Sequence, residues 1–179
     1  MKTKLTKELE KQDPEELLRL IREMARRFPI ANMYLSMEFG IDSEAILVKY
    51  KKQLDKEYFP TRGHGKARSS RANRILKEFD KLAAFAQDAA DLRFYQIELA
   101  AQYQKSNDYY YEPFIQNIYS NWQTLTVLLH KQGLLADFQD RVELLLGKTL
   151  KGTFIQENLQ EIWEEGAASL NEEEVEEDL

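Results

Sequence analysis

Apolar residues recur at every third or fourth position along almost the whole chain of 179 residues. The clearest stretch carries Leu17, Leu18, Ile21, Met24 and Phe28, a spacing that puts them on one side of an amphipathic helix. Strand-like alternation of apolar and polar residues is nowhere sustained. The pattern therefore predicts an all-α fold.

Capping residues and helix breakers set the expected boundaries. Asp13 followed by Pro14 is a strong helix start, and Gly133 after a basic turn is a typical helix end. Asp42 or Ser43 is expected to cap one helix, and Ser69 or Ser70 another. We predict helices near 3–11, 14–28, 30–39, 43–57, 70–82, 87–105, 112–132, 134–146 and 153–165.

Two of these helices, 87–105 and the second half of 112–132, are apolar on more than one side. The helix 87–105 carries one apolar face with Leu92 and Leu99 and another with Phe94 and Ile97, which is typical of a helix in the middle of its domain. The last four helices are expected to form two antiparallel hairpins. Helix starts show no constant spacing, so no internal repeat is expected. We predict a compact, irregular multi-helix bundle of eight or nine helices, with a short α-solenoid as the alternative.

Composition favours one soluble globular domain, expected over 1–168. The sequence contains no Cys, so disulfides and thiolate chemistry are excluded and a reducing compartment is favoured. No apolar run is long enough to span a membrane, and the charged N-terminus lacks the apolar core of a signal peptide. We expect a cytoplasmic protein that does not bind membranes.

Charge is unevenly distributed along the chain. The net charge is −6, and the segment 171–179 (NEEEVEEDL) alone carries six carboxylates, which leaves the body neutral. Such a like-charge block is typical of disorder, so we predict a disordered acidic tail over 169–179. The alternative is that this tail lies over a basic part of the same chain.

That basic part is the segment 58–77 (YFPTRGHGKARSSRANRILK), which contains no carboxylate. Its glycines could curl the backbone so that successive N–H groups cradle an anion, and a helix N-terminus behind them adds further donors. Its serines could donate hydroxyls, and its arginines could contact phosphate in bidentate fashion. The candidate anion- or partner-binding residues are Arg62, Gly63, Gly65, Lys66, Arg68, Ser69, Ser70, Arg71 and Arg74.

Several interpretations of this segment stay open. It could bind nucleic acid or another phosphate ligand, dock on a protein partner or second subunit, or form an ordinary solvated face in which Arg74 pairs with Glu78. Tyr58 next to the basic loop could stack on a base, although such aromatics more often pack in a core. The residues Gly63-His64-Gly65-Lys66-Ala67 do not form a phosphate-binding P-loop, because the first spacing is wrong, no Ser or Thr follows the Lys, and no strand is expected before them.

The order of these features resembles a known family. A Lys/Glu-rich opening helix precedes the pattern P-E-E-L-L-x-x-I, the turn Y-F-P-x-R-G precedes a basic helix, and an aromatic helical hairpin follows. Over about residues 5–150 this is similar to a bacterial family of small helical proteins known only as a domain of unknown function. The acidic tail departs from that pattern. The resemblance implies a helical fold and transfers no catalytic residue.

Residues suited to enzymatic chemistry are few. The two histidines, His64 and His130, are far apart and no Cys is present, so we expect no metal site, and no cofactor is predicted. Glu98 lies on the helix expected to be central, where a salt bridge is a better explanation than an acid–base role. We expect a non-enzymatic interaction module that binds a protein partner or itself through a surface including 58–77. Nucleic-acid or phosphate-ligand binding through the same segment is the alternative.

Overall fold

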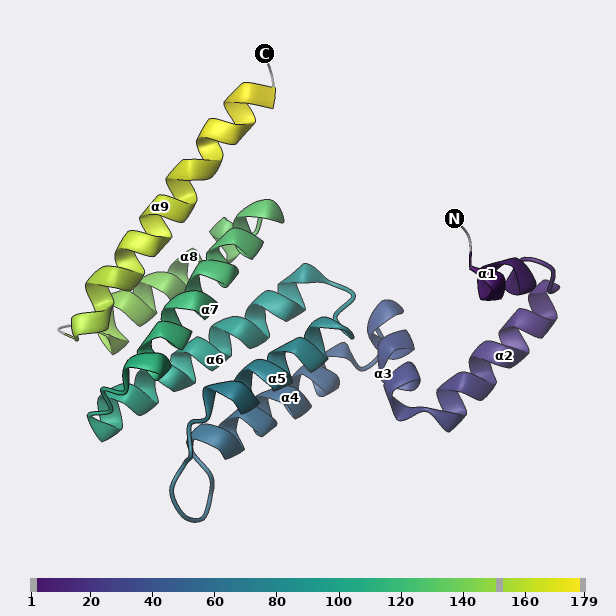
Figure 1. The fold of residues 1–179 in the computed structure, drawn as a ribbon, viewed down its shortest axis with the longest axis horizontal. Coiled ribbons are helices and arrows are strands. Elements are labelled where there is room, and N and C mark those ends of the chain that lie inside the picture. Colours follow the sequence, from purple (N-terminus) through teal and green to yellow (C-terminus); the bar gives the residue numbers. More distant parts are fainter. Residues whose placement is uncertain (1–2, 151–152, 178–179) are drawn as a thin grey trace.

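The computed structural model describes residues 3–150 and 153–177, with side chains described only up to residue 166 in the last helix. The described residues form helices and no strand, which confirms the all-α prediction. Figure 1 shows their arrangement. The elements are α1 (Lys4–Leu9), α2 (Pro14–Arg27), α3 (Pro29–Glu38), α4 (Ser43–Tyr58), α5 (Ser69–Asp80), α6 (Ala86–Asn107), α7 (Glu112–Lys131), α8 (Leu135–Leu144), a π-helical turn (Leu145–Thr149) and α9 (Phe154–Glu177).

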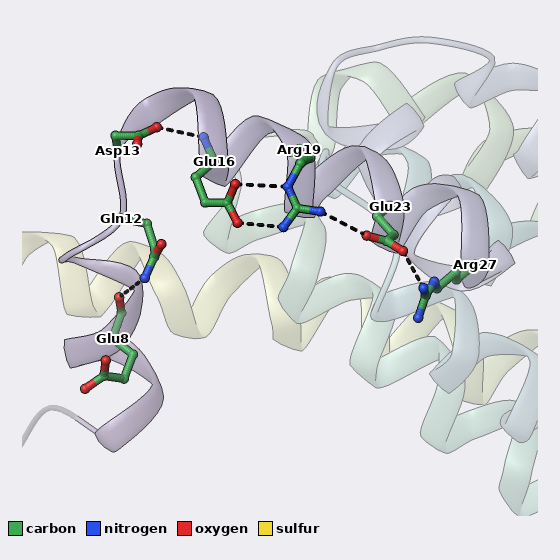
Figure 2. A network of polar contacts seen from close by, with 7 residues as sticks. All are labelled: Glu8, Gln12, Asp13, Glu16, Arg19, Glu23 and Arg27. Carbon is green, nitrogen blue, oxygen red and sulfur yellow. Dashed lines mark hydrogen bonds and ion pairs between the residues drawn. The ribbon is translucent and has the colours of Figure 1, made fainter.

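The first two helices form an arm that stands away from the rest of the molecule (Figure 1). The cap predicted at Asp13 is present, since its carboxylate accepts a hydrogen bond of 2.8 Å from the backbone N–H of Glu16. Along the polar side of α2, Arg19 bridges Glu16 and Glu23, and Glu23 also pairs with Arg27 (Figure 2). No residue of α2 is buried.

The core lies among α3 to α9, with Met37 as the buried residue of α3, and α6 runs through it. Leu92 points to one side of α6 and Phe94, Ile97 and Ala101 point to the opposite side, and all four are completely buried. The central position predicted for this helix is therefore confirmed. A helix surrounded on most sides cannot show a single apolar stripe, because each of its sides meets another element.

Helix α7 organises the C-terminal part of the bundle. It packs against α6, as a hairpin partner should, and α9 then lies along α7 (Figure 1). Trp122 of α7 donates a hydrogen bond of 2.8 Å from its Nε1 to the carbonyl oxygen of Leu159, and its ring lies 5.8 Å from that of Trp163. The last helix is thus held by α7 more than by α8, its neighbour in the chain.

Helix ends differ locally from the prediction. Gly133 has the left-handed φ of +66° expected after a helix, and Leu134 N–H returns to the carbonyl of Leu129 at 2.7 Å. The expected helix 134–146 instead ends at Leu144 and continues as the π-helical turn. Helix α9 runs to Glu177, so the boundary proposed at residue 168 falls within it, and a disordered tail stays a prediction.

Across the described ranges, no helix has both the length and the apolar character needed to cross a bilayer.

Candidate functional site

The segment 58–77 forms the end of α4, a projecting loop and most of α5 (Figure 1). All the cations predicted to act there are exposed, and they lie around the mouth of the loop and the first turns of α5. We call this surface the basic face. It comprises Lys56, Arg62, Lys66, Arg68, Arg71 and Arg74.

A carboxylate outside the predicted set lies at the centre of the basic face. Glu57 is only 4% exposed. Its Oε1 accepts hydrogen bonds from the backbone N–H of Arg68 at 3.0 Å and from Arg68 Nε at 2.9 Å, while its Oε2 accepts one from Arg68 Nη2 at 3.0 Å. Arg71 Nε lies 3.3 Å from the same Oε2. One anion of the chain itself therefore holds two of the predicted arginines.

The pKa of Glu57 reflects a balance between burial and these partners. Burial by itself raises the pKa, but the hydrogen bonds from Arg68 and the positive charges of Arg68 and Arg71 outweigh it, so that the net pKa is lowered. Glu57 is consequently ionised at neutral pH. Its negative charge is compensated within the protein.

The two glycines of the loop serve its backbone path. The carbonyl oxygen of Glu57 accepts hydrogen bonds from the N–H groups of Lys66 and Ala67 at 3.0 and 3.1 Å. A Cβ on Gly65 would lie 1.8 Å from the carbonyl oxygen of Tyr58, so only glycine fits. Gly63 needs glycine for another reason, its φ of +77°. Successive N–H groups do converge here as predicted, but they converge on the backbone of Glu57.

The expected serine caps are absent. Helix α5 begins at Ser69, its N-cap residue is Arg68, and no side chain of the cap residue bonds to the first turn. The prediction that Ser69 or Ser70 caps this helix was wrong, because the helix starts one residue earlier: the N–H groups of Arg71 and Ala72 already bond to the carbonyl oxygen of Arg68. Asp42 does occupy the N-cap position of α4, yet its side chain makes no capping hydrogen bond.

Two adjoining hollows open on the basic face. The first has a volume of about 280 Å³ and is lined by Arg68, Ser70, Arg71 and Arg74. The second has a volume of about 370 Å³ and is lined by Lys56, Glu57, Pro60, Arg62, His64, Lys66, Arg68 and Arg71. Because Arg68 and Arg71 line both, the hollows form one continuous cationic surface. Glu57 lies in the floor of the second.

The cations differ in how far they are already paired. Arg68 and Arg71 share Glu57, and Arg74 pairs with Glu78 at 3.7 Å across one turn, as anticipated. Within the described part of the chain, Arg62 and Lys66 have no carboxylate partner. Uncompensated positive charge is therefore concentrated on the loop side of the face.

Tyr58 cannot act as a stacking platform. It is 1% exposed, its hydroxyl accepts a hydrogen bond of 2.8 Å from Gln96, and burial raises its pKa to about 12. That alternative was wrong because the last turn of α4 faces the core.

The neighbouring Phe59 is partly exposed, and its ring rests 5.9 Å from that of Tyr103. Tyr103 in turn donates a hydrogen bond of 3.1 Å from its hydroxyl to the Gly65 carbonyl, which fixes the loop on α6.

A second polar cluster joins α4, α6 and α8. Asp91 receives ion pairs from Lys51 and from Arg141, and Arg141 also lies 3.2 Å from Glu98. Burial raises the pKa of Glu98, and the nearby charge of Arg141 opposes that rise. The salt bridge expected for Glu98 is thus present. No sequence signal pointed to Asp91 or Arg141, which are fifty residues apart.

Metal ligands are not gathered anywhere in the described ranges. Across those residues, no group of three or more His, Asp or Glu side chains is arranged to hold a metal ion. His64 lines the second hollow, while His130 lies in the last turn of α7.

Comparison with protein families shows which family the chain belongs to. The model of a family of unknown function, DUF6155, matches residues 1–166. The chain belongs to this family. The match takes in the arm and the basic face and ends before the acidic segment 171–179. No curated protein and no solved structure matches the chain.

The match agrees with the expectation of a family of unknown function, and it extends beyond the expected range of about 5–150 at both ends. It assigns no activity to any residue. What the basic face can do chemically therefore follows from its geometry: it offers exposed cationic side chains over two shallow hollows, with its converging backbone N–H groups already used by Glu57.

Proposed function

We propose that this protein is a non-enzymatic interaction module whose basic face binds an acidic segment of a partner protein. The observation that carries the proposal is that backbone N–H groups and side-chain cations of the basic face are used differently around Glu57. The backbone N–H groups are directed at Glu57, whereas the long side chains of Arg62 and Lys66 remain uncompensated at the rim. A row of partner carboxylates can pair with such side chains without needing the backbone.

The same division makes a phosphate ligand less suitable. Phosphate sites at helix N-termini use free backbone N–H groups, and here the N–H of Arg68, the N-cap residue of α5, is bonded to Glu57. Single-stranded nucleic acid is usually bound with the help of stacking aromatics, and Tyr58, the aromatic predicted for that role, is buried. Nucleic acid is therefore the alternative that the test must separate.

The test measures binding of two labelled probes across a salt series. One is an acidic peptide with the sequence of residues 171–179, which carries six carboxylates, and the other is a mixed pool of single-stranded RNA and DNA. Both are titrated with the full chain and with a chain that ends at residue 170, because the protein's own acidic segment could compete. We expect peptide binding that weakens as salt screens the charges.

The variant is the double change Arg62→Glu and Arg74→Glu, which reverses two exposed charges without touching Glu57. Its matched control, Lys131→Glu with Lys148→Glu, makes the same change of net charge at exposed positions of α7 and the π-helical turn, neither of which lines the hollows. We expect the first to weaken peptide binding at least about tenfold and the control to change it by less than about threefold. Equal losses of peptide binding in both variants would show that only the net charge of the protein matters, which would contradict the proposal.

Binding of the nucleic-acid pool in place of the peptide would support the alternative. In that case the logarithm of affinity should fall with the logarithm of salt concentration by about 0.7 to 0.9 per phosphate contact.

A further inference from the structure

The acidic segment 171–179 has the composition that the basic face requires of a partner. It carries six carboxylates and no cation. The rest of the chain, residues 1–170, holds as many acidic as basic side chains and is neutral. The chain therefore contains both halves of a charge-complementary contact, a basic face and an acidic segment.

The backbone of this segment forms the last turns of α9, which is helical as far as Glu177. The sequence places no basic residue in the last turn of this helix. Carboxylates are unfavourable at the negative, C-terminal end of a helix dipole, and like charges spaced four residues apart along a helix repel one another. The end of α9 therefore gains stability from cations that the helix itself does not supply.

The basic face of the same chain is out of reach of this segment. Helix α9 follows α7 in the same direction, because Trp122 bonds to Leu159 and a Cβ on Gly166 would lie only 2.4 Å from Thr126. At 1.5 Å per residue, the acidic segment begins about 25 Å beyond the start of α9. The loop of the basic face projects from the bottom of the molecule in Figure 1, whereas α9 ends at the top. A continuous helix cannot turn back across that distance.

A second copy can bring the two surfaces together. Because the basic face and the end of α9 lie at opposite ends of the molecule, two copies side by side and antiparallel place each acidic segment next to the basic face of the other copy (Figure 1). A two-fold axis relates the copies, so the contact occurs twice and the pair is closed. Once one contact has formed, the second is effectively intramolecular, which strengthens the pair.

We propose that the basic face binds the acidic segment 171–179 of a second copy of this chain in a reciprocal dimer. This inference rests on the proposed function, because it names a second copy as the source of the acidic segment that the basic face binds. Arg62 and Lys66 are the cations that receive the segment, since they have no carboxylate partner within the described part of the chain. The dimer brings together the opposite charges that a single chain holds apart.

The first experiment measures the mass of the full chain by sedimentation over a concentration series at low and at high salt. At about 50 mM salt we expect twice the chain mass of 21.1 kDa. At about 500 mM salt the charges are screened, and we expect the mass of a single chain. A dimer that is equally stable at both salt concentrations would contradict a contact made by charges.

Two variants each remove one half of the contact. The neutral-segment variant replaces the six carboxylates of 171–179 by their amides, and the reversed-face variant is Arg62→Glu with Lys66→Glu. Each should weaken self-association at least about tenfold. The control, Lys131→Glu with Lys148→Glu, has the same net charge as the reversed-face variant and should stay within about threefold of the wild type. Circular dichroism checks that all three keep their helix content.

Mixing the two variants tests whether the contact is between face and segment. The neutral-segment variant keeps its basic face, and the reversed-face variant keeps its acidic segment, so an equimolar mixture can form one of the two contacts. At about 100 μM of each we expect a heterodimer that is weaker than the wild-type dimer, because the second contact is missing. Dimerisation of the neutral-segment variant alone, or a mixture that stays monomeric, would overturn the proposal.

Binding of the peptide 171–179 to the neutral-segment variant separates this inference from the proposed function. If the peptide binds while the full wild-type chain stays a monomer up to about 100 μM, the basic face does bind acidic segments but a second copy is not the partner. If the peptide does not bind either, both the proposed function and this inference are wrong.

Discussion

A single carboxylate determines the character of the basic face. Glu57 is nearly buried and receives three hydrogen bonds from Arg68 as well as the charge of Arg71. A buried carboxylate is tolerated only with such partners, because removing its hydration is costly. The two arginines are therefore partly structural, and the free binding capacity of the face is shifted toward Arg62 and Lys66.

Replacing this carboxylate should have a measurable cost. We expect Glu57→Gln to lower the free energy of unfolding by about 1.5–3 kcal/mol, because charged hydrogen bonds become neutral and an amide N–H is turned toward Arg68. Urea denaturation at pH 7 measures the change. Glu78→Gln is the control: its pair with Arg74 is exposed and 3.7 Å long, so the loss should stay below about 1 kcal/mol. Equal losses would contradict a structural role for Glu57.

The pH dependence has a definite sign. The folded-state pKa of Glu57 is lowered, so its stabilising effect is complete above the pKa of an unfolded Glu, about 4.3, and disappears as the pH falls through the folded-state value. The difference in stability between the wild type and Glu57→Gln should therefore shrink below about pH 4. A difference that grows in acid would contradict this assignment.

At the scale of elements, the loop 59–68 is a short connection held at several points. Its N–H groups return to the end of α4, and the Gly65 carbonyl accepts from Tyr103 of α6. These contacts make the loop a defined support for its cations. The arm is the opposite case, a helix that has good caps and internal ion pairs but no buried residue.

The loop geometry can be tested at one glycine. Gly65→Ala should lower the free energy of unfolding by about 1–3 kcal/mol, because the new methyl group would overlap the Tyr58 carbonyl and force the backbone apart. Gly147→Ala is the control, since its Cβ would meet nothing within 4 Å and its φ is ordinary. That change should be neutral or stabilising by up to about 1 kcal/mol. Thermal unfolding of both variants decides between these expectations.

At the scale of the whole molecule, α7 connects the two ends of the bundle. It packs on α6 on one side and on α9 on the other, with Trp122 as the completely buried link. Because the Trp122 Nε1–H bonds to the backbone of Leu159, the position of α9 depends on this one side chain as well as on apolar packing.

We expect Trp122→Phe to lower the stability of the fold by about 1–3 kcal/mol through the lost hydrogen bond and the smaller ring. The chain has only two tryptophans, so this variant leaves Trp163 as the single reporter of α9. Its fluorescence should change at a lower urea concentration than in the wild type. Trp163 is only partly buried, so Trp163→Phe should lower the stability by less than Trp122→Phe does. The reverse order would show that α9 is not held through Trp122.

The sequence by itself determined the helices, the cap at Asp13, the glycine end at Gly133 and the clustering of cations in 58–77. These features depend on residues a few positions apart, which the spacing of side chains along a helix encodes directly. Only the tertiary structure decided that Glu57 fills the anion position, that Tyr58 is buried and that α9 lies along α7. Each of these depends on which helix faces meet, and many pairings of apolar faces satisfy the same periodicity. One feature of the sequence does point to Glu57: it is the last carboxylate before the segment 58–77, which contains none. Its partners could be found only once α4 and α5 were placed side by side.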